Sequence, residues 1–482
     1  MRVLRRASRR SPDDTSRERS STTMPKLSEW RMDEGDHDNV PKVNHRIQSF
    51  IKRPFVRSVI TVASGTAVAQ ALGMVFAPLI ARLYGPEVFG LQGLFMTMVG
   101  LLSTVAAMSY PTAIVLPKSD VDALGLARLS IYIGLGTALV AEILILYFHH
   151  NLFSLLNAEE IASFSFLIPV GMFLSVIGAV LSQWLVRKKS FKFIARSTVF
   201  TALILNSIKS GMGVMHPTAL VLIEANLIGT VTSTVITYFG WRKLSAGQGH
   251  AGKNFHIPTP LTQLANRYKD FPLLRTPQNL INAISQSLPV LLLATYFGAS
   301  DAGQYTLAIT VLGVPAAIIG GSVVSVFYPR INEALHKGED ARSLIIRATL
   351  GMAISGGLPF VTIILAGPYI FQLVFGEAWH TAGVYAQWLS PWIFLQYINK
   401  PAVSAIPALG IQGSLLIYEI FSTIIKILAL WIGFALYQNA TIAVAIFSVA
   451  GSFAYAWLIL WVIIKSGEFK LQSVHPKDLH ED

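Results

Sequence analysis

A glutamate and a lysine stand two helical turns apart in the apolar stretch LLIYEIFSTIIKILALW, as Glu419 and Lys426. Residues seven apart lie on one face of a helix, and Ser422 and Thr423 fall between them on the same side. An ionisable side chain in hydrocarbon costs roughly 2.5 kcal/mol or more, so it normally faces a cavity or a partner. The stripe therefore predicts one wall of a polar cavity or, alternatively, two charges that merely neutralise each other.

Other polar residues recur at helical spacing in apolar stretches. Asn206 and Lys209 are three apart, and Asn282 and Gln286 are four apart, so each pair shares a face of its helix. If these faces line the same cavity as Lys426, the cavity is positively charged, which suits a phosphate or pyrophosphate group. The predicted substrate-binding residues are Arg82, Lys209, Lys426, Asn206, Asn282 and Gln286.

Two of these cations have an equally good alternative interpretation. Lys209 lies in the outer half of its predicted span, from which a lysine side chain can reach the membrane surface. Arg82, beside Tyr84 at a predicted outer helix end, can reach the headgroups in the same way. The predicted ion-coupling candidates are Glu419, Glu224 and Glu142, of which Glu142 fits a packing or interface role as well.

The composition shows what must position these residues. The chain has 482 residues, of which 53% are hydrophobic and 13% charged, with a mean hydropathy of +0.54. Soluble proteins carry about 25% charged residues, and here the apolar residues come in blocks of about 20, the length that crosses a bilayer. The sequence therefore predicts an all-α, polytopic membrane protein.

Twelve membrane spans are expected. Almost all of the 38 Lys and Arg residues fall on one side of them, and Arg82 is the exception at an outer helix end. Positive residues mark cytoplasmic segments, so both termini are predicted inside and nucleic-acid binding is not needed to explain the net charge of +12. The spans are 58–81, 90–112, 127–148, 164–185, 198–215, 218–239, 278–297, 304–327, 345–367, 383–404, 412–434 and 441–464.

The chain repeats itself. YGPEVFGLQ, from Tyr84, and FGASDAGQY, from Phe297, both have an aromatic-Gly pair followed by a second glycine five residues on. This pattern predicts two parallel six-helix repeats around a central cavity, related by an axis along the membrane normal. The predicted segments are a disordered basic cytoplasmic tail (1–57, with Met24 an alternative start), the N-terminal half (58–239), a cytoplasmic linker (240–277), the C-terminal half (278–464) and a C-terminal tail (465–482).

Motifs for chemistry are sparse. The sequence contains no cysteine, no Walker A sequence and no HExxH, so no cofactor, no metal site and no enzymatic activity are predicted. The tail has no apolar run of the kind that a signal peptide needs.

Several stretches resemble one family. ARLYGPEVFGLQ is similar to the R-x-YGPE-x-FG turn of the polysaccharide transporter family, and SQWLVRKKSFKFIARS and FGEAWHTAGVYAQWLSPWIFLQ are also similar to its members. That family includes the O-antigen and exopolysaccharide repeat-unit flippases of the multidrug/oligosaccharidyl-lipid/polysaccharide exporter superfamily. The resemblance runs from about residue 55 to 465.

The resemblance implies a flippase of the bacterial inner membrane. It would move polyprenyl-pyrophosphate-linked oligosaccharide by alternating access for lipopolysaccharide, capsule or exopolysaccharide synthesis, with a polymerase and a chain-length regulator as partners. Three alternatives remain. A drug or metabolite exporter would share the helices but prefers cations, and a glycan polymerase or ligase would need a large outer loop. A lipid-linked peptidoglycan precursor is a further possible cargo.

Overall fold

The computed structural model describes residues 54–156, 159–246 and 259–474. Nearly all of the predicted tail 1–57 therefore lies outside the described residues. The same holds for part of the predicted linker and for the last residues of the predicted C-terminal tail.

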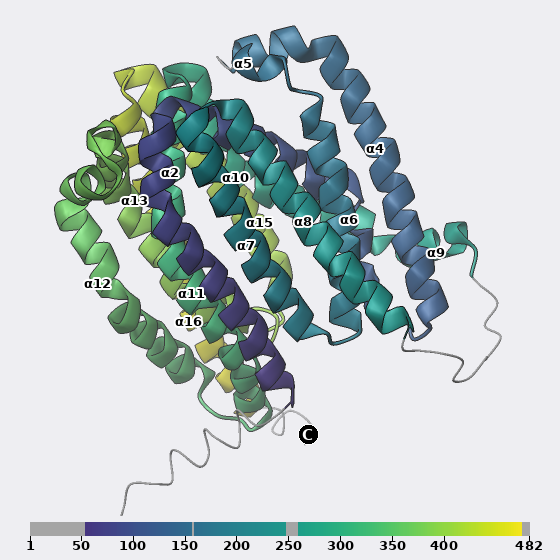
Figure 1. Ribbon diagram of the computed structural model, residues 1–482. Helices are drawn as coiled ribbons and strands as arrows, with labels where there is room; N and C mark the ends of the chain where they lie inside the picture. Colours follow the sequence, from purple (N-terminus) through teal and green to yellow (C-terminus); the bar gives the residue numbers. More distant parts are fainter. Residues whose placement is uncertain (1–53, 157–158, 247–258, 475–482) are drawn as a thin grey trace, which may run out of the picture. The chain divides into compact units, whose positions relative to one another are not determined.

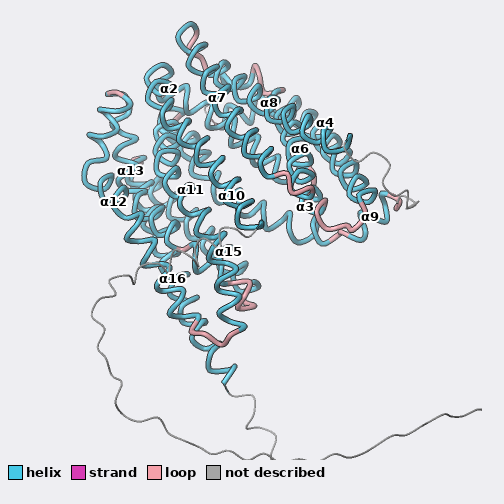
Figure 2. The backbone as a smooth tube through the Cα atoms, turned by 60° about the horizontal axis from the view of Figure 1, so that its bottom comes forward, coloured by secondary structure: helices cyan, strands magenta, loops and turns pink. Residues whose placement is uncertain are grey.

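The described residues form helices joined by short turns (Figures 1 and 2). Hydrocarbon offers a backbone no hydrogen-bonding partner, so an apolar span must satisfy its own N–H and C=O groups within a helix. The helices are α2 (Pro54–Ala106), α3 (Tyr110–Ala113), α4 (Asp120–Leu155), α5 (Glu159–Ala162), α6 (Leu167–Arg187), α7 (Phe191–Met215), α8 (Ala219–Ala246), α9 (Leu261–Arg267), η1 (Phe271–Arg275), α10 (Thr276–Phe297), α11 (Ala299–His336), α12 (Ala341–Phe375), η2 (Glu377–Trp379), α13 (His380–Ile398), α14 (Lys400–Ala405), α15 (Gln412–Tyr437) and α16 (Ala440–Val474).

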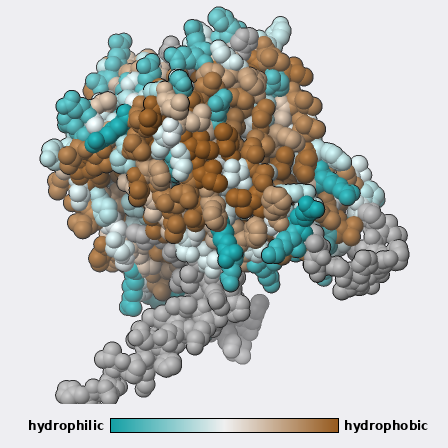
Figure 3. Space-filling view, viewed as in Figure 1, coloured by the Kyte–Doolittle hydropathy of each residue, from teal (hydrophilic) through white to brown (hydrophobic). Residues whose placement is uncertain are grey.

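Nine helices in the described part are long and apolar enough to cross a membrane. One of them, Thr61–Ala106, has 46 residues and is broken at Gly85, so it holds most of the first two predicted spans. The second was predicted to reach residue 112, but this helix ends at Ala106 and α3 follows. Helices α11 and α13, which carry the eighth and tenth predicted spans, are not among the nine. In Figure 3 hydrophobic side chains cover the middle of the visible face, and hydrophilic ones gather toward its upper and lower margins. The prediction of an all-α polytopic membrane protein is confirmed.

Some predicted boundaries differ from the helix ends. Helix α8 continues to Ala246, two short helices lie within the predicted linker 240–277, and α16 continues to Val474 in the predicted C-terminal tail. Hydropathy marks the part of a helix that lies in hydrocarbon, and the backbone ladder continues into polar residues until a turn ends it. The linker is therefore partly helical.

Each half of the chain packs mainly within itself. In the N-terminal half α2 packs on α7, α7 on α8, α8 on α6 and α6 on α4. In the C-terminal half α12 packs on α13, α13 on α16, α16 on α15 and α15 on α10. The largest contact between the halves joins α2 to α11. The residues of the predicted repeat lie at this contact.

The two aromatic-Gly pairs of the repeat adopt the same turn. Gly85 has φ 72° and ψ 173°, and Gly298 has φ 92° and ψ 173°. This region of backbone space is open essentially to glycine alone. Gly85 therefore breaks α2 where the first predicted span ends, as Gly298 separates α10 from α11. The shared conformation supports the pairing of these two sites in the repeat.

The second glycines of the repeat face each other where α2 crosses α11. A Cβ added at Gly90 would lie 1.7 Å from the carbonyl oxygen of Ala299, and one added at Gly303 would lie 1.8 Å from that of Pro86. Each glycine thus contacts the residue four positions before the other, as a pseudo-twofold relation between the halves requires. Only a residue without a side chain permits this approach.

Replacing Gly298 by alanine is expected to destabilise the protein. An L-residue held in this backbone region costs about 1–3 kcal/mol, so the melting temperature in detergent should fall. Gly313→Ala on α11 is the matched control, because an added Cβ there meets nothing within 4 Å. Equal melting temperatures for the two variants would contradict the account of the turn.

Candidate functional site

A polar cavity of about 470 Å³ lies among α10, α13, α14, α15 and α16. The polar stripe predicted on α15 lines this cavity. Its four residues, Glu419, Ser422, Thr423 and Lys426, therefore share one surface, as their spacing predicted. The polar lining residues are Asn282, Ser285, Gln286, Gln396, Asn399, Lys400, Tyr418, Glu419, Ser422, Thr423, Lys426 and Tyr455.

Lys426 is the buried cation of this cavity. Its residue is 9% exposed, and its Nζ donates a hydrogen bond of 2.8 Å to Ser285 Oγ on α10. Glu419 attracts it electrostatically, but no ion pair within 4 Å joins them among the described residues. An ammonium has three N–H donors, so two remain for an anionic ligand. The alternative of a mutually neutralised pair is therefore not supported by a direct contact.

The amides of Asn282 and Gln286 line the same cavity from α10. Gln286 Nε2 donates to Asn282 Oδ1 at 2.5 Å, as their spacing of one helical turn allows. The Gln286 carbonyl oxygen and the Asn282 amide nitrogen are not used in this bond. Together they offer an acceptor and a donor to a ligand with hydroxyl groups.

A second cavity of about 500 Å³ adjoins the first. Gln286, Trp392, Gln396 and Lys400 line both. The second cavity reaches α2 at residues 92, 93, 96 and 97, which belong to the N-terminal half. The two adjacent cavities together therefore reach from the C-terminal half to α2 of the N-terminal half.

Lys400 is a cation that the sequence analysis did not select. It begins α14, lines both cavities, and its Cγ and Cε lie 3.6 Å from the position of an added Cβ at Gly320 of α11. By the distribution of Lys and Arg along the sequence, Lys400 belongs with the cytoplasmic cations at the end of its span. The signal that could have found it is its position inside the predicted span 383–404, next to Asn399.

The other predicted binding residues do not line the polar cavity. Asn206 is buried on α7, and its Nδ2 donates to Ala202 O at 2.7 Å. This hydrogen bond joins the side-chain amide to the backbone of its own helix. Lys209 lies one turn further along α7, where its backbone carbonyl accepts a bond of 2.8 Å from Tyr84 Oη. No hydrogen bond of the Lys209 ammonium is found within the described ranges. Its role remains a prediction.

Arg82 joins the two halves of the chain. The side chain is exposed, and Nη2 donates to Leu373 O at 2.8 Å in the last turn of α12. A cation at this end of a helix also interacts favourably with the helix dipole. Trp379 Nε1 donates to Ala81 O at 3.0 Å beside it. Arg82 thus has a structural partner that neither interpretation of the sequence included.

The ion-coupling candidates are dispersed. Glu419 lines the polar cavity, whereas Glu224 on α8 and Glu142 on α4 are half-buried outside its lining. Among the described residues no group of three or more His, Asp or Glu side chains could hold a metal ion. The structure therefore brings together Asn282, Gln286, Glu419 and Lys426, and separates the rest from them.

Side chains of the repeat motif FGASDAGQY hydrogen-bond to the start of helix α13, a contact that the sequence pattern does not indicate. Gln304 Oε1 accepts from the Ala382 N–H at 2.9 Å, and Gln304 Nε2 donates to Ala378 O at 2.7 Å. Tyr385 Oη donates to Asp301 Oδ1. Asp301 and Gln304 of the motif thus fix the beginning of α13, the helix that carries Trp392 and Gln396 into the cavities.

Apolar helices that enclose a polar cavity, with a second cavity beside it, are typical of a polytopic membrane transporter. The family model described as polysaccharide biosynthesis protein matches residues 79–383, and the chain belongs to this family. The resemblance found in the sequence is confirmed.

Two curated relatives are similar over most of the length of this chain. The chain is 22% identical to the lipopolysaccharide biosynthesis protein WzxC of Escherichia coli K12 over 77% of this chain and 73% of that protein. It is 23% identical to the succinoglycan biosynthesis transport protein ExoT of Rhizobium meliloti over 64% of this chain. The match covers 60% of the length of ExoT.

Solved structures share the fold. An inward-facing multidrug resistance MATE family transporter of the MOP superfamily superposes with a TM-score of 0.67 at 15% identity, over 86% of this chain and 99% of that one. The lipid II flippase MurJ, in an inward closed conformation, gives a TM-score of 0.63 at 14% identity, over 86% and 91% of the two chains. At such identities the likeness concerns the fold alone.

Proposed function

We propose that this protein is a flippase for polyprenyl-pyrophosphate-linked oligosaccharide. It moves the repeat unit across the bacterial inner membrane by alternating access, for lipopolysaccharide, capsule or exopolysaccharide synthesis. The names of WzxC and ExoT, which refer to lipopolysaccharide biosynthesis and succinoglycan transport, support this substrate class. The single structural observation that carries the proposal is the pair of lysines, Lys400 and Lys426, in the lining of one polar cavity.

The parts of the cavity suit the parts of this substrate. Lys426 and Lys400 would bind the pyrophosphate through charge-assisted hydrogen bonds, which are roughly twice as strong as neutral ones. The amides of Asn282, Gln286 and Gln396 would bind sugar hydroxyl groups. In a water-poor cavity these interactions replace the hydration that the head group loses.

Alternating access requires a contact between the halves that can open. We assign this role to the end of the helices at which Gly85 and Gly298 lie, where α2 contacts α11 and Arg82 contacts α12. The distribution of Lys and Arg supports placing this end at the periplasmic side and both termini in the cytoplasm. A polymerase and a chain-length regulator would act on the delivered repeat units at the periplasmic side.

Fold similarity to a MATE transporter favours a drug exporter as the second candidate. Two lysines against one glutamate in the cavity lining make that candidate weaker, because cationic drugs would meet like charges. The glycan enzyme is a third candidate, and the name of ExoT, which refers to transport, does not favour it.

Complementation tests the proposed function. A strain that lacks its repeat-unit flippase is given the wild-type chain or the variants Lys426→Ala, Lys400→Ala, Lys209→Ala and Arg82→Ala at matched membrane levels. Restored surface glycan with the wild type, and loss with the two cavity lysine variants, is the expected result. Failure of the wild type in hosts with different glycans, together with new resistance to cationic drugs, would favour the exporter.

A further inference from the structure

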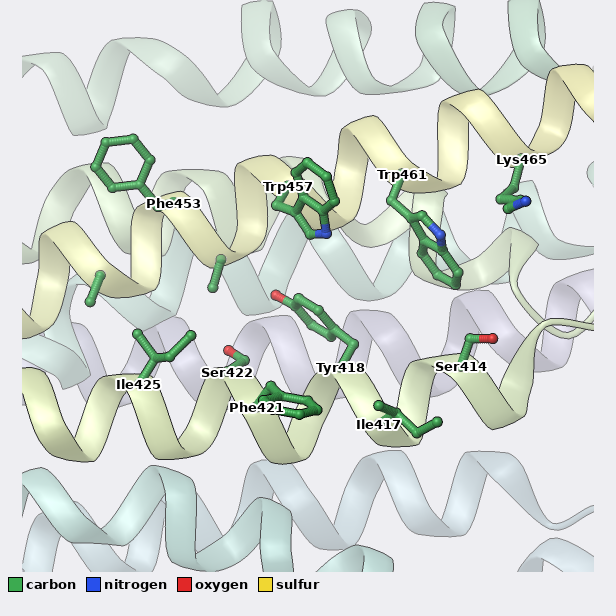
Figure 4. Close-up of a pocket in the computed structure, with 12 residues that line it drawn as sticks. Ser414, Ile417, Tyr418, Phe421, Ser422, Ile425, Phe453, Trp457, Trp461 and Lys465 are labelled. Carbon is green, nitrogen blue, oxygen red and sulfur yellow. The ribbon is translucent and has the colours of Figure 1, made fainter.

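An apolar groove of about 710 Å³ lies along the seam between α15 and α16 (Figure 4). Most of its side chains are aliphatic or aromatic, and five of these are exposed: Ile417, Phe421, Ile425, Phe453 and Trp457. In a bilayer the groove therefore opens to lipid. Its lining residues are Ser414, Ile417, Tyr418, Phe421, Ser422, Ile425, Ala450, Phe453, Ala454, Trp457, Trp461 and Lys465.

The groove and the polar cavity lie on opposite faces of the same seam. On α15, Glu419 and Lys426 line the cavity, whereas Phe421 and Ile425 line the groove. Two residues, Tyr418 and Ser422, line both. In Figure 4 these two side chains point from α15 toward α16, while Trp457 and Trp461 of α16 point back toward α15. The seam between the helices therefore has a polar side, an apolar side and a shared wall.

We propose that this groove binds the polyprenyl chain of the lipid-linked substrate while its pyrophosphate lies in the polar cavity. The ligand crosses the seam at Tyr418 and Ser422. Ser422 precedes Lys426 by one helical turn, so an anion at that lysine lies next to the shared wall. This inference rests on the proposed function, because it requires a ligand with an anionic head in the polar cavity and an apolar chain in the groove.

The physics of the bilayer limits what the groove contributes. A polyprenyl chain is already in hydrocarbon, so transfer from water drives nothing, and selectivity comes from van der Waals packing against shaped walls. The part of α15 from Ser414 to Ile425 rises about 17 Å at ~1.5 Å per residue. That is roughly half of a ~30 Å hydrocarbon core. The groove would therefore hold part of the chain, and the rest would stay in lipid.

The chain contains no cysteine, so a single introduced cysteine reports on one site. Phe453→Cys in the groove and Leu358→Cys on α12 are matched positions, since the native residues are 74% and 75% exposed. Each variant is labelled with an environment-sensitive fluorophore, placed in lipid nanodiscs and titrated with undecaprenyl pyrophosphate. A saturable signal is expected from position 453 and none from position 358. Inorganic pyrophosphate and dioleoyl phosphatidic acid should leave the signal at 453 unchanged.

A filling variant gives an independent measurement. Ala454→Trp occupies the groove, and Ile354→Trp adds the same side chain to an exposed site of α12 as its control. Binding of radiolabelled undecaprenyl pyrophosphate should weaken by about tenfold in the first variant only, which corresponds to ~1.4 kcal/mol. Helical content and monodispersity in detergent confirm that both variants fold.

The outcomes separate this proposal from the proposed function. Binding that depends on Lys426 but gives no signal at position 453 and tolerates Ala454→Trp would overturn the groove and leave the flippase standing. An equal signal with dioleoyl phosphatidic acid would also overturn it, because the groove would then accept any lipid. Absence of any Lys426-dependent binding would overturn the proposed function, and this inference with it.

Discussion

Lys426→Ala is expected to reduce transport of lipid-linked oligosaccharide by roughly 10–150-fold, because hydrogen bonds to charged groups are worth ~1.5–3 kcal/mol each. Lys426 is the buried cation of the polar cavity, and Ser285 is its hydrogen-bond partner within the described residues. Its removal also takes away one of the two cations, Lys426 and Arg275, that attract Glu419, which leaves this acidic side chain less balanced beside the site of an anionic ligand. Both effects disfavour pyrophosphate binding.

Two further variants separate charge from packing. Lys426→Arg keeps the charge and should retain a substantial part of the activity, although its planar fork cannot reproduce the geometry of an ammonium. Lys337→Ala removes an exposed lysine that pairs with Glu333 far along α11, and it should transport normally. Surface glycan measured at matched membrane levels distinguishes the variants. Wild-type glycan with Lys426→Ala would remove this lysine from the site.

Gly90→Val and Gly303→Val are expected to abolish transport in a protein that still inserts and folds. A side chain at either glycine would overlap a backbone carbonyl oxygen of the other half, and a backbone cannot move aside as a rotamer can. The halves would then be held apart at the end where Arg82 binds Leu373 O. One of the two alternating states would be lost.

Thiol reactivity measures this separation directly. A single cysteine at Ala81, which is fully buried next to the contact, should react slowly with a maleimide in the wild-type background and faster with Gly90→Val or Gly303→Val. Gly73→Val is the matched control, since it lies on the same helix and an added Cβ there meets nothing within 4 Å. Arg82→Ala should show a smaller increase, because one hydrogen bond is lost and no overlap is created. Unchanged reactivity and normal transport in Gly90→Val would contradict the role of this contact.

The class of fold could be predicted from the sequence because hydrocarbon leaves an apolar span few choices. The face of α15 was also predictable, since residues seven apart share a helix face whatever packs against it. The residue pattern also predicted the repeat, in which Gly85 and Gly90 correspond to Gly298 and Gly303. In the structure the first glycine of each pair forms a turn, and the second lies where α2 crosses α11.

Other parts of the site required tertiary structure. A helix face gives the direction of Asn206 and Lys209 on α7 but not the identity of the helix opposite, and neither residue lines the cavity with Lys426. Lys400 was overlooked because a lysine at the end of a span has an ordinary explanation in topology. The hydrogen-bond partner of Arg82, Leu373 O, lies in the other half of the chain, and no local sequence pattern could indicate it.

The central claim is tested most directly with purified protein in liposomes that contain a fluorescent undecaprenyl-pyrophosphate oligosaccharide. Glycan that reaches the outer leaflet is detected by a membrane-impermeant glycosidase or lectin, with Lys426→Ala in parallel liposomes. The account predicts that wild-type protein exposes the glycan faster than empty liposomes do and that the variant is at least about tenfold slower. Equal exposure in wild-type and empty liposomes, for repeat units of the host's own surface glycan, would contradict it.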